Sequence, residues 1–536
     1  MSRNRTPIRG GRRLGRRSRG QQTEQPAAPA PPSGDLQQML DRIRSESGDS
    51  PDIIIRRLNI GKQGNKEVAI IYLDGLVDNQ QVNENVAGAL LKLASNPVNP
   101  EQGGSWVDMI IHQVVQTGGA FAEDKWQEII LSILSGNTAI LVEGSTQAVI
   151  CITQGGAWRS VSEPTSQLVV RGPKDCFIES ISTNISLIRR RIKSSKLHLE
   201  TLRIGELSHT QIGLMYMEGV ADKDLIAEVK ERLHSIKTNG VLESAYIEEF
   251  IEDKVFTPFP TIFNTERPDV AASNLMEGRV VLLVEGTPFV LILPTVLAQF
   301  FQSAEDYSQR FDISILMRFV RYLSFLVLLL GPSIYIALTT FHYQMLPTQL
   351  LISLVAQREG VPFPAFVEAV LMEVAFEILR EAGVRMPRAV GQTVSIVGAL
   401  ILGQAVVEAG IITPVMVIVV ALTGIASFAI PAYNLAIAGR LIRFSFMVLA
   451  AMFGLYGITL GMIVLVAHMA SLRSFGVPYL APLTPFMLRD NKDTLLRFPM
   501  PFMNKRTQVI SGDERDLNNK EIKKSDSSDP SPKKGS

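Results

Sequence analysis

Apolar positions dominate the stretch 323–471, where charged residues become rare. Between residues 389 and 470 the acidic and basic side chains are limited to Glu408, Arg440, Arg443 and His468. A helix that crosses a bilayer needs roughly 20 mainly apolar residues, because its backbone amides must bond within the segment. Four stretches approach that length: Leu323–Leu338, Val390–Val407, Ile412–Ile430 and Phe444–Met469. One water-soluble core would not hold so many, so the pattern predicts an all-α polytopic membrane domain over residues 304–475.

The half of the chain that precedes this block contains an internal duplication. The segment Val68–Asp78 reappears as Ile212–Asp222, and Gly136–Ser145 reappears as Gly278–Thr287. The first signature pairs Tyr72 with Tyr216, Asp74 with Glu218, and Gly75 with Gly219. Because the two signatures stand a similar distance apart in both copies, we predict a soluble region of two related tandem subdomains, residues 51–160 and 161–303.

Both copies predict the same order of elements. A β-branched run ends at an acid–Gly turn, where glycine can adopt a positive φ. Helices are expected next, at residues 79–94 and 125–134 of the first copy and 223–236 and 244–252 of the second. Two strands joined by a second acid–Gly pair then form a tight hairpin. The fold class is therefore α/β, with strands covered by helices, followed by the membrane domain.

The recurring acids of these turns are the first candidates for catalysis. Asp74, Glu143, Glu218 and Glu285 could act as paired carboxylates, but turn chemistry already accounts for an acid beside a glycine. No histidine or lysine recurs at matching positions, and motifs for a phosphate loop, a nucleophile elbow or a zinc protease are missing from the sequence. We expect no catalytic residues, no metal site, no cofactor and no enzyme. Cys151 and Cys176 lack metal or redox spacing and are expected to be buried thiols.

The two ends of the chain differ from the rest in composition. Eight arginines lie in the first twenty positions, and a Pro/Ala tract follows at 26–32. Such a segment predicts disorder over residues 1–50, and the polar segment 476–536 is expected to be largely disordered as well. An Arg-rich arm can contact anionic lipid or nucleic acid, but a solvated tail is favoured and no nucleic-acid partner is expected. No apolar run follows the arginines, so we expect no secretory signal and a cytosolic soluble region.

Acidic residues interrupt the apolar stretch 361–381. Pro364 suits a helix start. Glu373, Glu377 and Glu381 recur every four residues on one helix face, whereas Glu368 points elsewhere. Acids among so many apolar residues must line water, pair with cations or lie at the membrane interface. Two interpretations stay open: these four glutamates line a cation path, or they belong to a surface helix and pair with Arg380, Arg385 and Arg388.

Small residues mark two further positions in the predicted membrane domain. Gly331 and Pro332 interrupt the first span, since proline removes a helical hydrogen bond; the resulting kink would serve gating or only packing. Gly454, Gly457 and Gly461 form a face of small residues that permits close helix approach. Replacement of Gly457 by leucine is expected to disrupt oligomers.

Loop charges leave the number of crossings open. Glu408 begins a short acidic turn expected outside, whereas Arg440 and Arg443 favour the inside. If the 364–380 helix spans, five crossings place the C-terminus outside, although Arg489, Lys492 and Arg497 favour the inside. We expect four to five spans, with five favoured, and the side of the C-terminus stays undecided.

Several motifs in both halves point to one protein family. They are Gly172–Ser180, Thr183–Arg191, Pro258–Asp269, Thr339–Tyr343, Arg358–Pro364, Arg380–Pro387 and Ser474–Leu480. In these motifs the chain resembles the A subunits of GerA-type nutrient germinant receptors of endospore-forming bacteria, or a stage-V sporulation paralogue.

The resemblance implies a multi-pass subunit in the spore inner membrane. Its implied partners are a transporter-like B subunit that senses nutrient, a lipoprotein C subunit, further copies of itself and membrane lipid. The implied activity is a ligand-gated channel that releases cations early in germination. The alternative is a secondary transporter or ion-coupled carrier that uses Glu373 or Glu377, although the membrane block shows no repeated half of the kind many carriers have.

Overall fold

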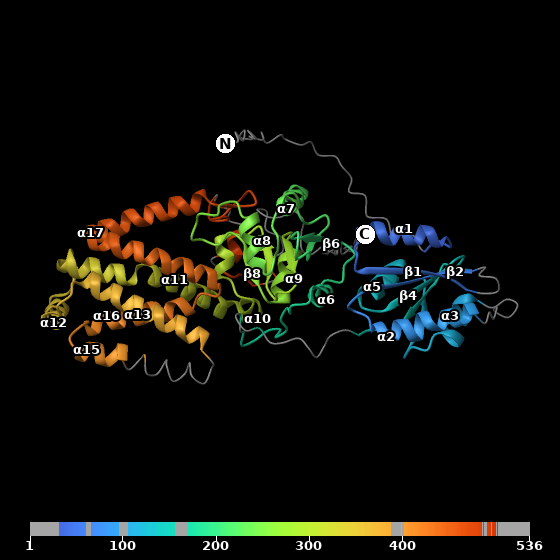
Figure 1. Cartoon of the computed structure of the whole chain (residues 1–536), viewed down its shortest axis with the longest axis horizontal. Coiled ribbons are helices and arrows are strands. Elements are labelled where there is room, and N and C mark those ends of the chain that lie inside the picture. The colour runs from blue at the N-terminus through green and yellow to red at the C-terminus, as the bar shows by residue number, and fades with distance from the viewer. Residues whose placement is uncertain are drawn as a thin grey trace, which may run out of the picture.

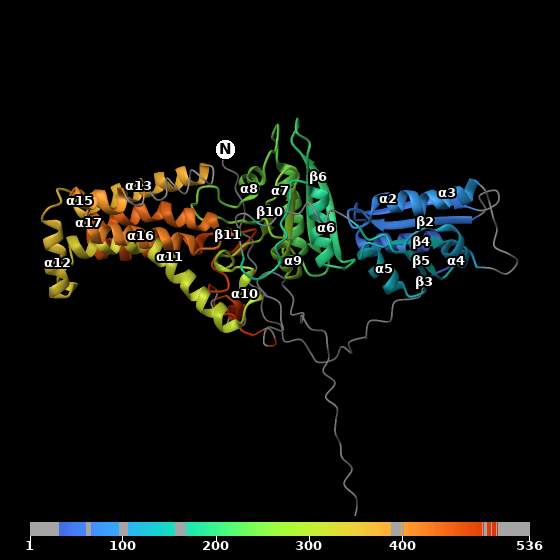
Figure 2. The ribbon, with the colours of Figure 1, turned by 90° about the horizontal axis from the view of Figure 1, so that it is seen from below.

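Two α/β subdomains and a helical bundle follow one another along the long axis of the molecule (Figures 1 and 2). The computed structural model describes residues 32–60, 66–95, 105–155, 169–386, 401–484 and 490–494, together with 164, 167, 398, 486, 496–499 and 501. The predicted span 390–407 and both predicted tails lie largely outside these residues.

The first subdomain is built on a five-stranded sheet with the order β1-β2-β4-β5-β3, in which every pair is antiparallel. Its strands are β1 (Ile53–Ile60), β2 (Lys66–Leu73), β3 (Ala120–Glu123), β4 (Thr138–Val142) and β5 (Ala148–Cys151). Its helical segments are α1 (Leu36–Ser47), α2 (Asn79–Gln81), η2 (Val82–Ala87), α3 (Gly88–Ser95), α4 (Trp106–Met109), η3 (Ile110–Val114) and α5 (Trp126–Leu134). Helices α1 and α5 pack on one face of the sheet, and α3 and η3 pack on the other.

Helix α1 corrects the expectation of disorder over residues 1–50. Leu36, Met39, Leu40 and Ile43 are buried against Trp126 and the sheet, and the Asp35 side chain accepts a hydrogen bond from the Gln38 amide at the N-terminus. These four apolar positions have helical spacing. The Arg-rich and Pro-rich composition upstream obscured that short pattern.

The second subdomain repeats this arrangement, with the strand order β6-β7-β9-β10-β8. Its strands are β6 (Leu197–Ile204), β7 (Thr210–Met217), β8 (Phe263–Thr265), β9 (Val280–Val284) and β10 (Val290–Leu293). Its helices are α6 (Ile181–Arg191), α7 (Lys223–Ser235), α8 (Ser244–Ile251) and α9 (Pro268–Met276), followed by the short η4 (Leu297–Phe301). Helices α6 and α9 pack on one face, and α7 and α8 pack on the other. The predicted α/β layering of the soluble region is confirmed.

The recurring acids hold equivalent places in the two copies. One carboxylate oxygen of Glu143 accepts the Leu36 amide of α1 at 2.8 Å, and one of Glu285 accepts the Ile181 amide of α6 at 2.9 Å. A carboxylate that accepts a first-turn amide satisfies a donor with no partner inside the helix. These two glutamates therefore fasten a helix to the β4–β5 or the β9–β10 turn.

A buried ion pair joins the two subdomains. Arg189 of α6 donates from Nε to Asp52 at 2.8 Å and from Nη1 to the carbonyl oxygen of Leu197 at 2.6 Å. Ser50, beside Asp52, accepts the Leu199 amide of β6 at 3.1 Å. Because Arg189 and Asp52 are both buried, loss of either partner would leave an uncompensated charge.

The helical part begins with α10 (Glu305–Ser308) and α11 (Phe311–Thr340). It continues through η5 (Tyr343–Met345), α12 (Thr348–Arg358), α13 (Ala365–Arg385), η6 (Ile401–Ala405), α15 (Val406–Glu408), α16 (Pro414–Phe428) and α17 (Tyr433–Ser471). Within the described ranges, α11 and α17 are long and apolar enough to cross a membrane, and α16 is apolar but shorter. In the apolar windows of α11 and α17 only 28% and 33% of the residues are buried, whereas a core helix of a soluble protein is mostly buried.

Helix α17 reverses its direction at Gly454. This residue has φ 61° and ψ −140°, outside the helical region. A side-chain carbon on Gly461 would lie 2.8 Å from Leu449 and 2.9 Å from Phe446, which a straight helix would hold far away. The two legs, 433–453 and 455–471, run side by side in Figure 1. The stretch Phe444–Met469, predicted as one span, therefore belongs to two antiparallel helices.

The chain returns from α17 to the subdomain from which α11 departs. A short hairpin, β11 (Arg473–Ser474) and β12 (Val477–Pro478), follows α17. Ser474 accepts the Thr295 amide at 3.0 Å and donates to the carbonyl oxygen of Thr261 at 2.7 Å. The Leu297 amide donates to Tyr479 at 2.8 Å. The bundle thus begins and ends on the second subdomain.

Candidate functional site

The acidic helix predicted from residue 364 onward is α13, which begins after Pro364 and ends at Arg385. Its spacing of four places Glu373, Glu377 and Glu381 along one side, but their surroundings differ. The side chain of Glu373 is fully buried, that of Glu377 is 42% exposed and that of Glu381 is 62% exposed. One helix side therefore runs from the bundle interior to its surface.

Glu373 lies between helices α16 and α17. Its carboxylate approaches the guanidinium of Arg443 to 2.6 Å, and it accepts a hydrogen bond from Thr423 at 3.4 Å. The Thr423 methyl group sits 2.7 Å from the place that a side-chain carbon on Gly331 would occupy. Gly331 thereby lets α16 pack closely against α11. This contact supports the packing interpretation of Gly331 and Pro332, and Pro332 lies inside a continuous α11.

Glu377 bridges two arginines from different helices. It accepts from Arg380 Nη1 at 3.1 Å, and its other oxygen accepts from Arg440 of α17. Arg380 also donates to Ser427 of α16 at 3.2 Å. We call Glu373, Glu377, Arg380, Arg440 and Arg443 the charge cluster. It joins α13, α16 and α17 at one level of the bundle.

The other two predicted glutamates lie outside the charge cluster. Glu381 pairs with Arg385 one turn further along α13, at the surface. Glu368 is buried near the opposite end of α13, where it accepts the Thr413 amide and hydroxyl, both at 2.9 Å. Arg358 stands 3.7 Å from it. Glu368 therefore caps the start of α16. It does not face the same way as the other three glutamates, which agrees with its spacing in the sequence.

An open groove runs along the outer side of α13. It has a volume of about 620 Å³ and is lined by Val374, Glu377, Ile378, Glu381, Ala382, Arg385 and Phe444. Two of the four predicted glutamates reach it, and Glu373 and Glu368 do not. The groove is therefore apolar along most of its length, with an acidic edge that continues into the charge cluster.

The predicted glycine face packs against its own chain. Gly457 meets the backbone of Leu449, and Gly461 meets Leu449 and Phe446, all on the first leg of α17. Gly454 makes the turn and would place a side-chain carbon 2.7 Å from His342. Close helix approach at these glycines is thus a contact between two legs of one hairpin.

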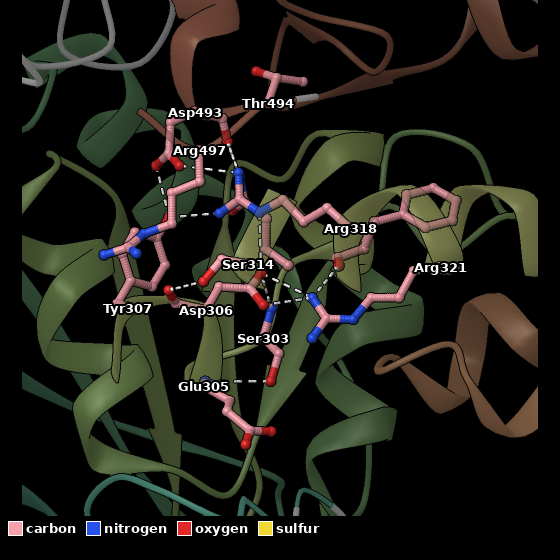
Figure 3. A network of polar contacts seen from close by, with 12 residues as sticks. Ser303, Glu305, Asp306, Tyr307, Ser314, Arg318, Arg321, Asp493, Thr494 and Arg497 are labelled. Carbon is pink, nitrogen blue, oxygen red and sulfur yellow. Dashed lines mark hydrogen bonds and ion pairs between the residues drawn. The ribbon is translucent and has the colours of Figure 1, made fainter. Parts of the chain in front are cut away.

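A second polar cluster, the junction network, was missed in the sequence (Figure 3). Arg318 of α11 is fully buried and donates to Asp306 at 3.0 Å and to Asp493 at 3.0 Å. Arg321 donates to both oxygens of Asp306 at 2.8 Å, and the Tyr307 hydroxyl donates to Asp493 at 2.6 Å. The network ties the end of the second subdomain, the start of α11 and the C-terminal segment into one unit.

The network was missed because no motif in the sequence marks Asp306 and Asp493 as partners of Arg318 and Arg321. Arg497 extends the network by donating to the Gln309 carbonyl at 3.1 Å and stacking over the Tyr307 ring at 5.2 Å. Throughout the described ranges, no three His, Cys, Asp or Glu side chains are grouped so as to hold a metal ion. Both clusters are thus made of ion pairs and hydrogen bonds.

Comparison with known proteins gives matches over both the soluble and the helical parts. A family model described as "Bacillus/Clostridium GerA spore germination protein" matches residues 41–509. "Spore germination protein KA" of Bacillus subtilis (strain 168) is 49% identical over 495 residues, which cover 92% of this chain and 90% of that protein. "Spore germination protein A1" of the same organism is 40% identical over 444 residues, with 83% and 90% covered.

A solved structure also matches the chain. It is the crystal structure of the N-terminal domain of the A subunit of the Bacillus megaterium spore germinant receptor GerK3. The two share 35% sequence identity with a TM-score of 0.40, and the match covers 50% of this chain and 98% of that one.

Proposed function

The chain belongs to the GerA family of spore germination proteins, and on this premise we propose that it is the A subunit of a nutrient germinant receptor. In this proposal several copies assemble in the spore inner membrane, and their helical parts enclose a ligand-gated cation path whose opening triggers germination. A transporter-like B subunit and a lipoprotein C subunit are the proposed partners.

The observation that carries the channel proposal is the acidic edge of the groove. Glu377 and Glu381 are partly exposed on a surface whose other side chains, apart from Arg385, are apolar, such as Ile378 at 65% exposure. Acidic groups that faced lipid would be costly, so they must face water or another protein. A neighbouring copy that covers the groove would enclose these carboxylates beside a wet path.

Glu373 and Glu368 receive a different role in this proposal. Both are fully buried within one protomer, with partners on α16 and α17 or on α12 and α16. A passing cation could not reach these two carboxylates without opening the bundle, whereas Glu377 and Glu381 are partly exposed. We therefore place the path along the outer side of α13, with Glu377 and Glu381 as its candidates, and assign Glu373 and Glu368 to holding the helices together.

The return of α17 to the second subdomain supports an even number of crossings. The hairpin at Gly454 contributes two crossings where the sequence counted one, so the favoured count of five becomes six if the segment around 390–407 also spans. Arg318 and Arg321 of α11 lie at the subdomain end of the bundle, where both pair with Asp306. Basic residues favour the cytosolic side, so the soluble region and the C-terminal segment are both placed there.

Ion flux through purified protein in liposomes tests the proposal. A channel passes cations down a gradient without saturable exchange, whereas a carrier requires a counter-substrate. Glu377→Gln and Glu381→Gln should each lower cation flux about threefold to tenfold, because a pore-lining carboxylate raises the local cation concentration. Glu359→Gln, at an exposed site outside the groove, is the matched control.

Two results would contradict the assignment. Unchanged flux in both groove variants, with normal assembly, would remove α13 from the path. Saturable exchange in the wild-type protein would instead favour an ion-coupled carrier.

A further inference from the structure

The charge cluster contains buried donors without acceptors. Arg443 is fully buried, and its Nε, Nη1 and Nη2 atoms donate no hydrogen bond within the described chain. Nε of Arg440 and Nε of Arg380 are likewise buried and unbonded. The approach of Arg443 to Glu373 brings the charges together but lacks hydrogen-bond alignment, since Glu373 Oε2 is also without a bond. Buried polar groups normally find a partner. Nη2 of Arg443 has the Glu373 carboxylate beside it, so the four other nitrogens point to a missing acceptor.

The charges of the cluster do not balance. Arg380, Arg440 and Arg443 supply three positive charges, and Glu373 and Glu377 supply two negative ones, which leaves one positive charge. Aromatic rings flank the guanidinium groups, with Phe376 at 5.0 Å from Arg380, Tyr433 at 5.8 Å from Arg440 and Phe444 at 5.7 Å from Arg443. A ring face attracts a cation but accepts these N–H groups poorly. One monovalent anion would therefore neutralise the net charge of the cluster.

The cluster adjoins the groove on the outer side of α13. Phe444 lines that groove, and its ring lies against the guanidinium of Arg443. Glu377 also lines the groove, and it accepts hydrogen bonds from the two other arginines, Arg380 and Arg440. Phe444 and Glu377 thus contact both the groove and the arginines of the charge cluster.

We propose that the charge cluster binds one small monovalent anion, of the size of chloride, between α13 and α17. The anion accepts hydrogen bonds from Arg443 and its neighbours and neutralises the remaining positive charge. Guanidinium groups suit this task because they are always charged and weakly hydrated. The site does not depend on the proposed ion path, since binding can be measured at equilibrium without flux.

Thermal unfolding of the full-length protein in detergent tests this site. Chloride or bromide replaces gluconate at constant ionic strength, and the unfolding midpoint is followed as the halide rises. A bound anion stabilises the folded state in a saturable way. We expect saturable stabilisation by chloride and bromide in the wild-type protein.

Variants with opposite expected effects keep the test decisive. Arg443→Gln should abolish the halide response. Glu373→Gln removes a competing negative charge and should bind chloride about tenfold more tightly, because a unit charge a few ångströms away changes the electrostatic free energy by at least that much. Arg310→Gln, at an exposed arginine outside the bundle, should match the wild type.

A midpoint that stays unchanged as halide replaces gluconate, in both the wild type and Glu373→Gln, would overturn the proposal. The Glu373→Gln result stands even if Arg443→Gln fails to fold. Lost cation flux with a retained halide response, or the converse, separates this proposal from that of the channel.

Discussion

Two buried arginines of this chain, Arg318 and Arg443, differ in what their guanidinium groups meet. Both are fully buried. Arg318 donates from Nε and Nη1 to carboxylates and from Nη2 to the Tyr307 hydroxyl, so its desolvation is offset by charged hydrogen bonds. Arg443 has a carboxylate nearby but no hydrogen bond among the described residues. Arg318 therefore acts as a structural anchor, whereas the equally buried Arg443 is a candidate ligand-binding residue.

At the same scale, α8 holds an acid whose ionisation opposes folding. Burial, together with the negative charges of Glu252, Glu243 and Glu249, raises the pKa of Glu248 to about 7 from the ordinary 4.5. The carboxyl group is thus neutral in both states below about pH 4.5. Between pH 4.5 and 7 the unfolded state releases the proton first, so the destabilisation grows, and above pH 7 it is complete.

Glu248→Gln should therefore stabilise α8 on the order of 1 kcal/mol above pH 7 and leave it unchanged near pH 4.5. Amide hydrogen exchange of α8 in the full-length protein, compared with wild type at each pH, measures the effect. Glu231→Gln, at an exposed acid of α7, is the control. Equal protection of the Glu248→Gln and wild-type proteins at pH 8 would show that Glu248 is already solvated.

At the scale of elements, the reversal of α17 depends on glycine. The turn at Gly454 needs a positive φ, and Gly457 lies against the Leu449 backbone, which cannot move aside as a flexible side chain can. A bulky residue at position 457 would therefore force the two legs apart.

Gly457→Leu should lower stability by about 1–3 kcal/mol or more through this overpacking. The thermal midpoint in detergent reports the loss. Gly383→Leu is the matched control, because Gly383 lies on α13 with open space around it. A Gly457→Leu protein with a wild-type midpoint but smaller oligomers would instead place this glycine between protomers, as expected from the sequence.

Periodicity and turn chemistry predicted α5, α7, α8 and both acid–Gly hairpins, because each of these elements is encoded within a short window. The reversal at Gly454 was missed, since a hairpin of two apolar legs has the composition of one long span. The pairs of Glu377 with Arg380 and of Glu381 with Arg385 belong to one of the two interpretations made from the sequence, because each pair lies within about one turn of α13. The partners on α17, Arg443 for Glu373 and Arg440 for Glu377, were missed for a different reason. Arg440 and Arg443 lie far along the chain, and only packing of α13 against α17 brings them near.

At the scale of the whole molecule, the second subdomain holds both the first and the last residues of the helical part. The junction network fixes the start of α11, and β11, β12 and Tyr479 fix the end of α17 on the same subdomain. Asp493 and Arg497 add a third attachment. The helical part therefore begins and ends at the same end of the bundle, next to the second subdomain.

This arrangement predicts where the C-terminus is accessible. Ser536→Cys should react with a membrane-impermeant maleimide from the same side as Leu207→Cys, an exposed position of the second subdomain. The native thiols should give little background, because both are buried and burial raises the pKa of Cys151 and Cys176 to about 12. Labelling of the two engineered cysteines from opposite sides would rule out an even number of crossings.

The junction network has a mechanical consequence. Arg318 and Arg321 grip the same Asp306, while Asp493 reaches Arg318 from the far end of the chain. A tilt of the second subdomain would consequently rotate α11 about Asp306, and it would move the end of α17, which is attached to the same subdomain. α13 and α16 lie between these helices in the chain. They would rotate with them, because Arg380, Arg440 and Arg443 link α13, α16 and α17.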